Sequence, residues 1–110
     1  MSDQALRRAQ ARLHRLDYYP RPVSIRWVRV VHAAWLFRLP WLRRFDGYAT
    51  HRLIFLRSRQ IDDDLLTHEL CHVWQMQHHP LRMPLSYLRT GYTSNRYEAE
   101  ARRAVAETRR

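Results

Sequence analysis

The chain has 110 residues, 45% of them hydrophobic, with four tryptophans and six tyrosines. This length favours one domain, residues 1–110, and this composition favours a folded chain over a disordered one. A single cysteine excludes an internal disulfide. The formal charge of +10 predicts attraction to an anionic partner, although the arginines are scattered and no nucleic-acid-binding motif accompanies them.

The N-terminal sequence MSDQALRRAQARLHRL lacks the apolar segment and the small-residue cleavage site of a secretory signal peptide. The most apolar region, residues 23–42, is interrupted by arginines and by Pro40, so no membrane span is expected. We therefore expect a cytoplasmic protein, and a monomer. A lone cysteine fits a reducing compartment.

The N-terminal segment, residues 1–20, is predicted to contain a helix over residues 4–16. Apolar side chains recur there at three- and four-residue steps, at Leu6, Ala9, Leu13 and Leu16. Pro20 and Pro22 prevent the helix from continuing.

Residues 23–57 are predicted to form a short mixed sheet of two to four strands. Residues 23–31 and 52–57 are rich in β-branched and aromatic side chains, which favour strands. Residues 48–50 either begin the second strand or add another one.

The segment between these strands, residues 32–45, is ambiguous. Its AAWLFRL stretch fits a short helix that Pro40 ends. Asp46 and Gly47 then indicate a turn.

The next segment, residues 62–79, is predicted to be a helix. The three aspartates at residues 62–64 suit a helix N-terminus, because they cap free N–H groups and oppose the positive end of the helix dipole. The helix is expected over residues 63–78, and Pro80 ends it.

A loop containing Pro84 and Gly91 is expected to follow. Asn95 is a suitable cap for a last helix over residues 97–108, within the segment 95–109. The order of elements therefore predicts a small α+β domain.

The central helix carries the string HELCHVWQMQHH, from His68 to His79. His68 and His72 lie one helical turn apart on the same face, so both imidazoles can bind one cation. Glu69 lies about 100° around the helix from His68, within reach of a water on that cation. This order of residues on a helix is typical of hydrolytic zinc sites, in which the glutamate is the general base and acid.

A catalytic zinc ion needs a third protein ligand. The spacing to His78 resembles the metzincin pattern HExxHxxGxxH, but Gln75 replaces the glycine that breaks the helix in that family. On an unbroken helix His78 lies about 240° around from His72 and points away. We expect His78 to be a solvent-facing residue near the helix C-terminus.

The other option comes from a resemblance. HELCHVWQ followed by NRYEAEAR, in which Glu98 is three residues before Ala101, is similar to the gluzincin zinc metallopeptidases. The resemblance covers residues 23–105 and is greatest to the minimal single-domain gluzincins and to the peptidase-like core domain of bacterial contractile-injection-system proteins. It implies a zincin-like fold in which the small Ala101 lets the two helices pack closely.

The resemblance also implies roles. His68, His72 and Glu98 would bind one Zn²⁺ ion, and Glu69 would be the general base and acid of peptide-bond hydrolysis. A peptide or protein substrate would bind along the strand Leu53–Leu56 by strand addition.

Two positions depart from the family pattern. Arg102 stands where many gluzincins have an aspartate that orients a ligand histidine. Glu100 either substitutes for it or is a solvated residue that pairs with an arginine, and we favour the second reading. The oxyanion donor is open among three tyrosines, with Tyr92 preferred because its loop is expected to face the site: Tyr87, Tyr92 and Tyr97.

The remaining notable residues are interpreted as structural. Cys71 is expected to be a small buried side chain that points away from the ligands. The core is expected to include the residues that pack the central helix on the sheet, together with the other tryptophans: Leu66, Leu70, Val73, Trp74, Trp27, Trp35 and Trp41.

Two further functions stay open. A cleft in so small a domain is shallow, and a terminal segment that plugs it would leave a latent enzyme or a zinc-binding interaction module without turnover. The basic charge favours a nucleic-acid-associated metalloprotease related to the SprT-like proteins, which share HExCH-type strings. Those proteins use a third histidine, so the glutamate helix argues against this alternative.

Overall fold

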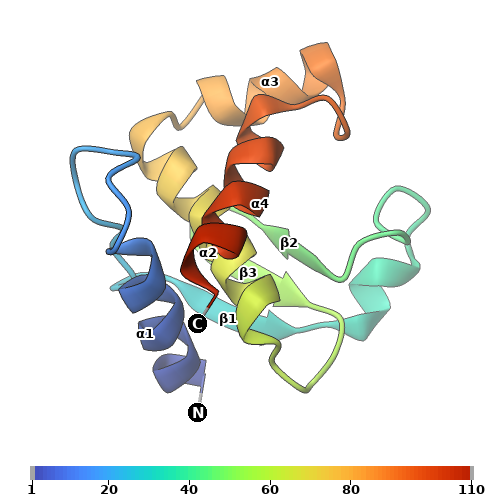
Figure 1. Cartoon of the computed structure of the whole chain (residues 1–110). Coiled ribbons are helices and arrows are strands. Elements are labelled where there is room, and N and C mark those ends of the chain that lie inside the picture. Colours follow the sequence, from blue (N-terminus) through green and yellow to red (C-terminus); the bar gives the residue numbers. More distant parts are fainter. Residues whose placement is uncertain (1, 110) are drawn as a thin grey trace.

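A computed structural model of the chain describes residues 2–109 (Figure 1). The order of elements is α1 (Ser2–Leu13), β1 (Arg29–His32), the 3₁₀ helix η1 (Ala34–Arg38), β2 (Gly47–Ala49), β3 (Leu53–Leu56), α2 (Asp63–His78), α3 (Arg82–Thr90) and α4 (Arg96–Thr108). The described residues thus form a small α+β fold with four α-helices and a three-stranded mixed sheet, as the sequence predicts. None of these helices combines the length and the apolar character needed to cross a membrane.

The sheet has the strand order β1-β3-β2. β1 runs parallel to β3, and β2 runs antiparallel to it, so Phe55 lies between Val31 and Tyr48. The strand Leu53–Leu56 is therefore central, with hydrogen-bonding partners on both sides. The edge strands are β1 and β2.

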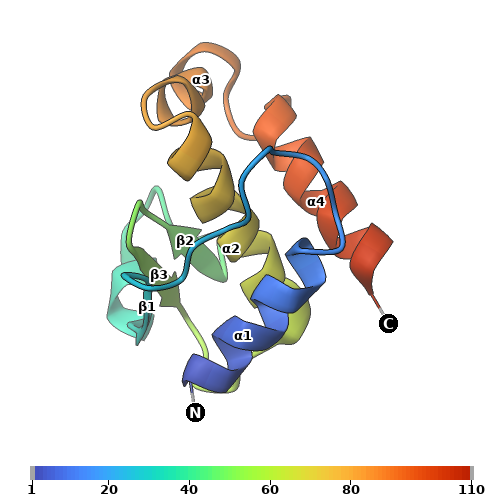
Figure 2. The ribbon, with the colours of Figure 1, turned by 90° about the vertical axis from the view of Figure 1, so that its left-hand side faces the viewer.

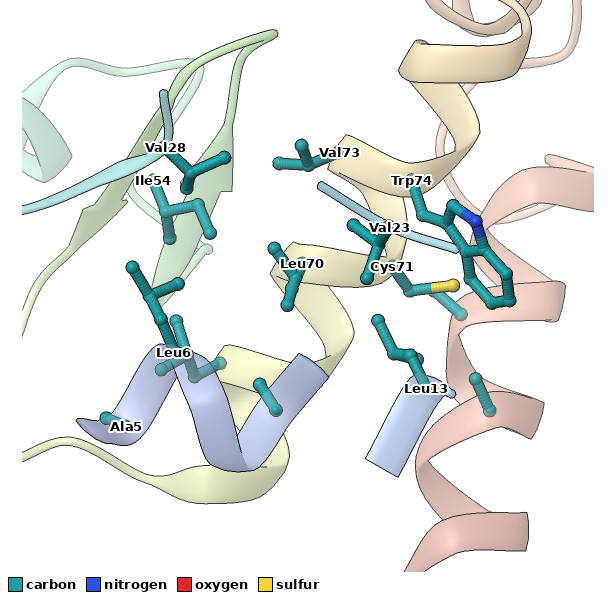
Figure 3. Packing of buried hydrophobic residues seen from close by; sticks show 14 of the residues in the cluster. Ala5, Leu6, Leu13, Val23, Val28, Ile54, Leu70, Cys71, Val73 and Trp74 are labelled. Atoms are coloured by element: carbon teal, nitrogen blue, oxygen red, sulfur yellow. The ribbon is translucent and has the colours of Figure 1, made fainter. Parts of the chain in front are cut away.

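Helix α2 lies between the sheet on one side and α4 on the other (Figure 2). Helix α1 lies beside α2, at the left in Figure 1 and in front in Figure 2. The core fills this arrangement: Ile54 of β3 faces Leu6 of α1 and Leu70 of α2 (Figure 3). Cys71 is buried in the same cluster, which confirms it as a small buried side chain. Ala101 of α4 is fully buried there as well.

The predicted α2 helix has the bounds that the sequence indicates, residues 63–78. Asp62 is its N-cap, and its carboxylate accepts hydrogen bonds from the backbone N–H groups of Asp64 and Leu65. The last helix is also confirmed, because Asn95 caps α4 by accepting from the N–H groups of Tyr97 and Glu98. Local capping signals therefore place both helices that carry the candidate ligands.

The predicted strand over residues 23–31 is wrong for most of its length, since only Arg29–His32 is a strand. The backbone N–H and C=O groups of Ser24 bond instead to the side-chain amide of Gln77 on α2. The carbonyl of Arg21 accepts from the indole of Trp74. Side chains of α2 thus satisfy the backbone groups that a strand partner would otherwise satisfy.

The turn expected at Asp46 and Gly47 is present only as a bend at Asp46. Gly47 begins β2, and residues 48–50, whose assignment was open, add this separate strand. The ambiguous segment after β1 contains η1, in keeping with a short helix before Pro40.

The loop expected around Pro84 is helix α3. Proline is tolerated in the first turn of a helix because the N–H group there has no helical partner, and Pro84 is the third residue of α3. Gly91 ends the helix with a φ of 71°, a conformation that glycine adopts without strain.

Three tryptophans that we expected in the core are on the surface. The exposed fractions are 62% for Trp27, 66% for Trp35 and 69% for Trp41, whereas Trp74 is 1% exposed. Trp27 lies in a turn before β1, Trp35 lies in η1, and Trp41 lies between η1 and β2. In so small a chain, the core is filled by the faces of α1, α2 and α4, which leaves these side chains outside it.

Candidate metal centre

Three side chains from two helices converge at one point between α2 and α4. Nε2 of His68 lies 2.6 Å from Oε1 of Glu98, and Nε2 of His72 lies 3.0 Å from Oε2 of Glu98. One donor atom from each of the three residues lies within 4.8 Å of the others, and the group could hold a metal ion. These are the three residues that the sequence motif and the gluzincin resemblance nominate.

Glu98 is 1% exposed, and its carboxylate is held in the ionised form. Burial raises its pKa, but the hydrogen bonds and charges of His68 and His72 outweigh burial and bring the pKa below its usual range. Burial lowers the pKa of His72, yet the hydrogen bond with Glu98 and the nearby Glu69 raise it above its ordinary value. The site therefore favours negative charge on the carboxylate and positive charge opposite it.

The orientation of His72 is determined by Gln75. The amide nitrogen of Gln75 donates to the backbone carbonyl of Tyr97 at 2.8 Å and to Oε1 of Glu100 at 3.1 Å. The amide oxygen therefore faces Nδ1 of His72 at 2.7 Å, so this ring nitrogen carries a hydrogen and donates it. In neutral His72, Nε2 then has a lone pair directed at Glu98.

These contacts provide a test of whether the residues fit a metal ion. The lone pairs of His72 Nε2 and Glu98 Oε2, 3.0 Å apart, repel each other unless a proton or a metal cation lies between them. Two imidazole nitrogens and one carboxylate are also the ligand set of a catalytic zinc site that keeps a position open for water or substrate. The donors and their orientation fit a divalent cation.

Glu100 corrects the interpretation that we favoured from the sequence. It does not stand in solvent beside an arginine. It is half-buried, accepts from Gln75 and also accepts from the hydroxyl of Tyr19. Glu100 thus supports His72 through Gln75, because a buried amide with fixed partners on its nitrogen can present only its oxygen to the ring.

The predicted general base, Glu69, lies beside this group. It is 6% exposed, and burial raises the pKa of its carboxyl group. Gly47 of β2 covers it so closely that a Cβ atom at residue 47 would lie 3.0 Å from Oε2 of Glu69. A larger residue at position 47 would therefore require the Glu69 carboxylate to move by a few tenths of an ångström.

Two of the three candidate tyrosines reach the site. The hydroxyl of Tyr92 donates to Oε1 of Glu98 at 2.8 Å, and that of Tyr87 donates to Oε2 at 3.1 Å. Burial and the Glu98 contact raise the pKa of Tyr92 to about 12, so its hydroxyl keeps its proton. Tyr97 packs elsewhere, in a small cluster with Met76 and Met83.

His78 is not part of the group. Its Nδ1 atom contacts the carbonyl of Trp74 at 3.1 Å, and its ring stacks on Tyr19. The structure agrees with the expectation that His78 points away from His72, although its ring is packed rather than free in solvent.

A cleft of about 390 Å³ opens beside His68, Glu69 and Tyr92. Its walls come from the segment before β2, from α2 and from α4. A larger hollow of about 570 Å³ lies between the end of β3 and the start of α2, and it contains none of the candidate ligands. The smaller cleft is the one that leads to the candidate metal centre.

The structure contradicts substrate addition along Leu53–Leu56, since both edges of this strand are paired. The edge strand beside the cleft is β2. The backbone carbonyl of Asp46 accepts from Arg57, and the backbone N–H of Thr50 donates to Leu53. Tyr48 lies opposite Phe55, midway between these two bonds. The backbone groups of the alternate residues, Gly47 and Ala49, therefore point toward the free edge of β2.

Sequence reasoning missed three residues that shape the site: Gln75, Tyr19 and Gly47. The sequence drew attention to Gln75 only as the residue that stands in place of the metzincin glycine. Its position three residues after His72 places it on the neighbouring turn, and this spacing is the signal that could have identified it. Tyr19 and Gly47 have no local signal, because their contacts exist only in the assembled fold.

Models of known protein families, curated protein sequences and solved structures were each compared with this chain, and none of them matches. The resemblance to the gluzincins therefore remains a prediction from the residues quoted above.

Proposed function

We propose that the protein is a zinc-dependent metallopeptidase with a gluzincin-type site. The observation that carries the proposal is the convergence of His68, His72 and Glu98 beside Glu69, at the end of a cleft. His68, His72 and Glu98 would hold the ion. When bound, zinc polarises a substrate carbonyl and makes water a stronger acid near neutral pH.

The chain's own residues supply the remaining chemistry. Glu69 takes a proton from the attacking water and passes it to the leaving amine, and its raised pKa suits this double role. Gln75 keeps a hydrogen on Nδ1 of His72, which leaves Nε2 free for the ion. The hydroxyl of Tyr92 or of Tyr87 would donate to the developing oxyanion after leaving Glu98.

An extended peptide would bind along the free edge of β2. The outward backbone groups of Gly47 and Ala49 can pair with a substrate strand, and Gly47 lies directly against the side chain of Glu69. This placement brings the substrate backbone to the side of the cleft where Glu69 lies.

A second function has one observation in its favour. In this conformation both tyrosine hydroxyls, those of Tyr87 and Tyr92, are engaged with Glu98 rather than directed at a substrate. That arrangement suits a zinc-binding module that acts without turnover. Hydrolysis by the wild-type protein separates the two functions.

The test is the Glu69→Gln substitution. The isosteric amide should leave zinc content unchanged, since Glu69 is not in the ligand group, and should lower the rate of casein cleavage by about 10²- to 10⁴-fold. Zinc is measured by elemental analysis, and cleavage is measured with the zinc-loaded protein. Equal cleavage by wild type and variant would contradict the role of Glu69, and no cleavage by either would favour the module without turnover.

A further inference from the structure

Three arginines line the cleft beside the candidate metal centre, and only one of them is neutralised. Nε of Arg109 lies 2.8 Å from Oδ2 of Asp64. Within residues 2–109, no ion pair involves the other two, Arg44 and Arg102. Both are exposed at the cleft.

Three carboxylates line the cleft, and none of them is both exposed and unpaired: Glu69 is only 6% exposed and lies under Gly47. Asp46 pairs with Arg57, which lies outside the cleft, at 3.4 Å. Asp64 pairs with Arg12 at 2.8 Å as well as with Arg109. The charges left without partners at the mouth of the cleft are therefore positive, and a cleft concentrates such a field.

The guanidinium groups of Arg44 and Arg102 both lie near the ring of Tyr92. The guanidinium carbon of Arg44 lies 5.2 Å from the centre of this ring, and that of Arg102 lies 5.7 Å from it. The hydroxyl of the same tyrosine reaches Glu98 at 2.8 Å. A guanidinium stacked on an aromatic ring keeps its N–H groups available for hydrogen bonds in its own plane.

We propose that Arg44 and Arg102 form a carboxylate-binding subsite, so that the cleft selects peptides with a carboxylate close to the bond that faces the metal centre. The inference rests on the proposed function and adds its substrate class. The carboxylate belongs either to an acidic side chain or to the C-terminus of the substrate. Planar guanidinium groups match either of them, because each pairs its N–H groups with two carboxylate oxygens.

The test measures binding rather than turnover. Zinc-loaded Glu69→Gln protein is titrated into three fluorescent peptides of one sequence: an amidated peptide with a glutamate, its amidated glutamine twin, and the glutamine twin with a free C-terminus. At least one carboxylate peptide should bind roughly 3- to 10-fold more tightly than the amidated glutamine twin, and the preference should shrink as salt rises. The carboxylate peptide that binds more tightly than the amidated glutamine twin shows whether the subsite prefers an acidic side chain or a C-terminus.

Substitutions then test whether Arg44 and Arg102 cause the preference for a carboxylate peptide. Arg44→Gln and Arg102→Gln should each reduce it, and Arg44→Lys should keep only part of it, because the charge stays but the planar pair of N–H groups is lost. Arg109→Gln is the matched control, an arginine in the same cleft that is already paired with Asp64, and it should leave the preference intact.

Equal binding of the three peptides, or no binding of any, would overturn the subsite. A DNA oligomer that displaces the acidic peptide and binds more tightly than it would assign the two arginines to phosphate and also overturn the inference. Cleavage by the wild-type protein is measured separately. If the wild-type protein cleaves nothing while the carboxylate preference persists, the proposed peptidase activity is wrong and the subsite stands.

Discussion

At the scale of single residues, the candidate site depends on the carboxylate of Glu98. Four polar groups meet on its two oxygens, the imidazoles of His68 and His72 and the hydroxyls of Tyr87 and Tyr92. Such a buried charge is stable because each oxygen has two partners. The same four contacts bring the imidazole donors to the positions from which they can bind an ion.

Gln75 gives the first residue-scale prediction. Gln75→Leu removes the acceptor that holds the hydrogen on Nδ1 of His72, so zinc affinity should fall by about 10- to 100-fold. Competition with a chromophoric chelator measures the affinity. Gln77→Leu is the control on the same helix, because Gln77 bonds to the backbone of Ser24 and not to a ligand. Equal affinities of the two variants would contradict the orienting role.

The sequence predicts part of this site because its spacing is local. His68, Glu69 and His72 lie on one helix, where the 3.6-residue period alone determines their relative directions. Glu98 was predicted as a ligand only through the gluzincin resemblance, and in the structure it lies beside His68 and His72. Gln75 and Glu100 could not be linked from the sequence, since 25 residues separate them and their contact requires α4 to pack on α2.

At the scale of elements, α2 depends on its N-terminal cap. Asp62→Ala should lower the free energy of unfolding by about 1 kcal/mol, because the N–H groups of Asp64 and Leu65 lose their acceptor. Denaturant unfolding of the metal-free protein measures the change. Asp62→Asn keeps a side-chain acceptor and should retain most of the stability. Equal losses in both variants would show that the cap contributes little.

The helices of the chain were easier to predict than the strands. α2 and α4 have periodic apolar faces and capping residues, both of which are local signals. Residues 23–28 have the composition of a strand, but Gln77 of α2 bonds to the backbone of Ser24, and Gln10 of α1 donates to the carbonyl of Val23. The segment with Pro84 was expected to be a loop, but it is α3, and the place of Pro84 in the first turn makes it compatible with the helix.

At the scale of the whole molecule, Asp64 joins three parts of the chain. Its carboxylate pairs with Arg12 of α1 and with Arg109 after α4. The hydrogen bond from Arg12, which outweighs the effect of burial, and the one from Arg109 bring the pKa of Asp64 below its usual value. A group with a lowered pKa in the folded state stabilises the fold above its unfolded pKa and loses that contribution as the pH falls.

The Asp64→Asn variant tests this contribution. At pH 7 the wild-type protein should be more stable than the variant by about 1 kcal/mol, since the carboxylate is partly exposed and solvent screens its two pairs. The difference should shrink as the pH falls from about 5 to below 4, where the unfolded carboxyl group takes up its proton. Denaturant unfolding at each pH measures it, and a difference that grows toward acid would contradict the sign.

The most direct test of the central claim is a zinc titration of three proteins: wild type, Glu98→Gln and His78→Gln. If His68, His72 and Glu98 bind the ion, wild type and His78→Gln should each bind one zinc with the same affinity. Glu98→Gln should bind it at least about 100-fold more weakly, because a neutral amide is a poorer ligand than a carboxylate. Unchanged affinity in Glu98→Gln, or a loss confined to His78→Gln, would contradict the account.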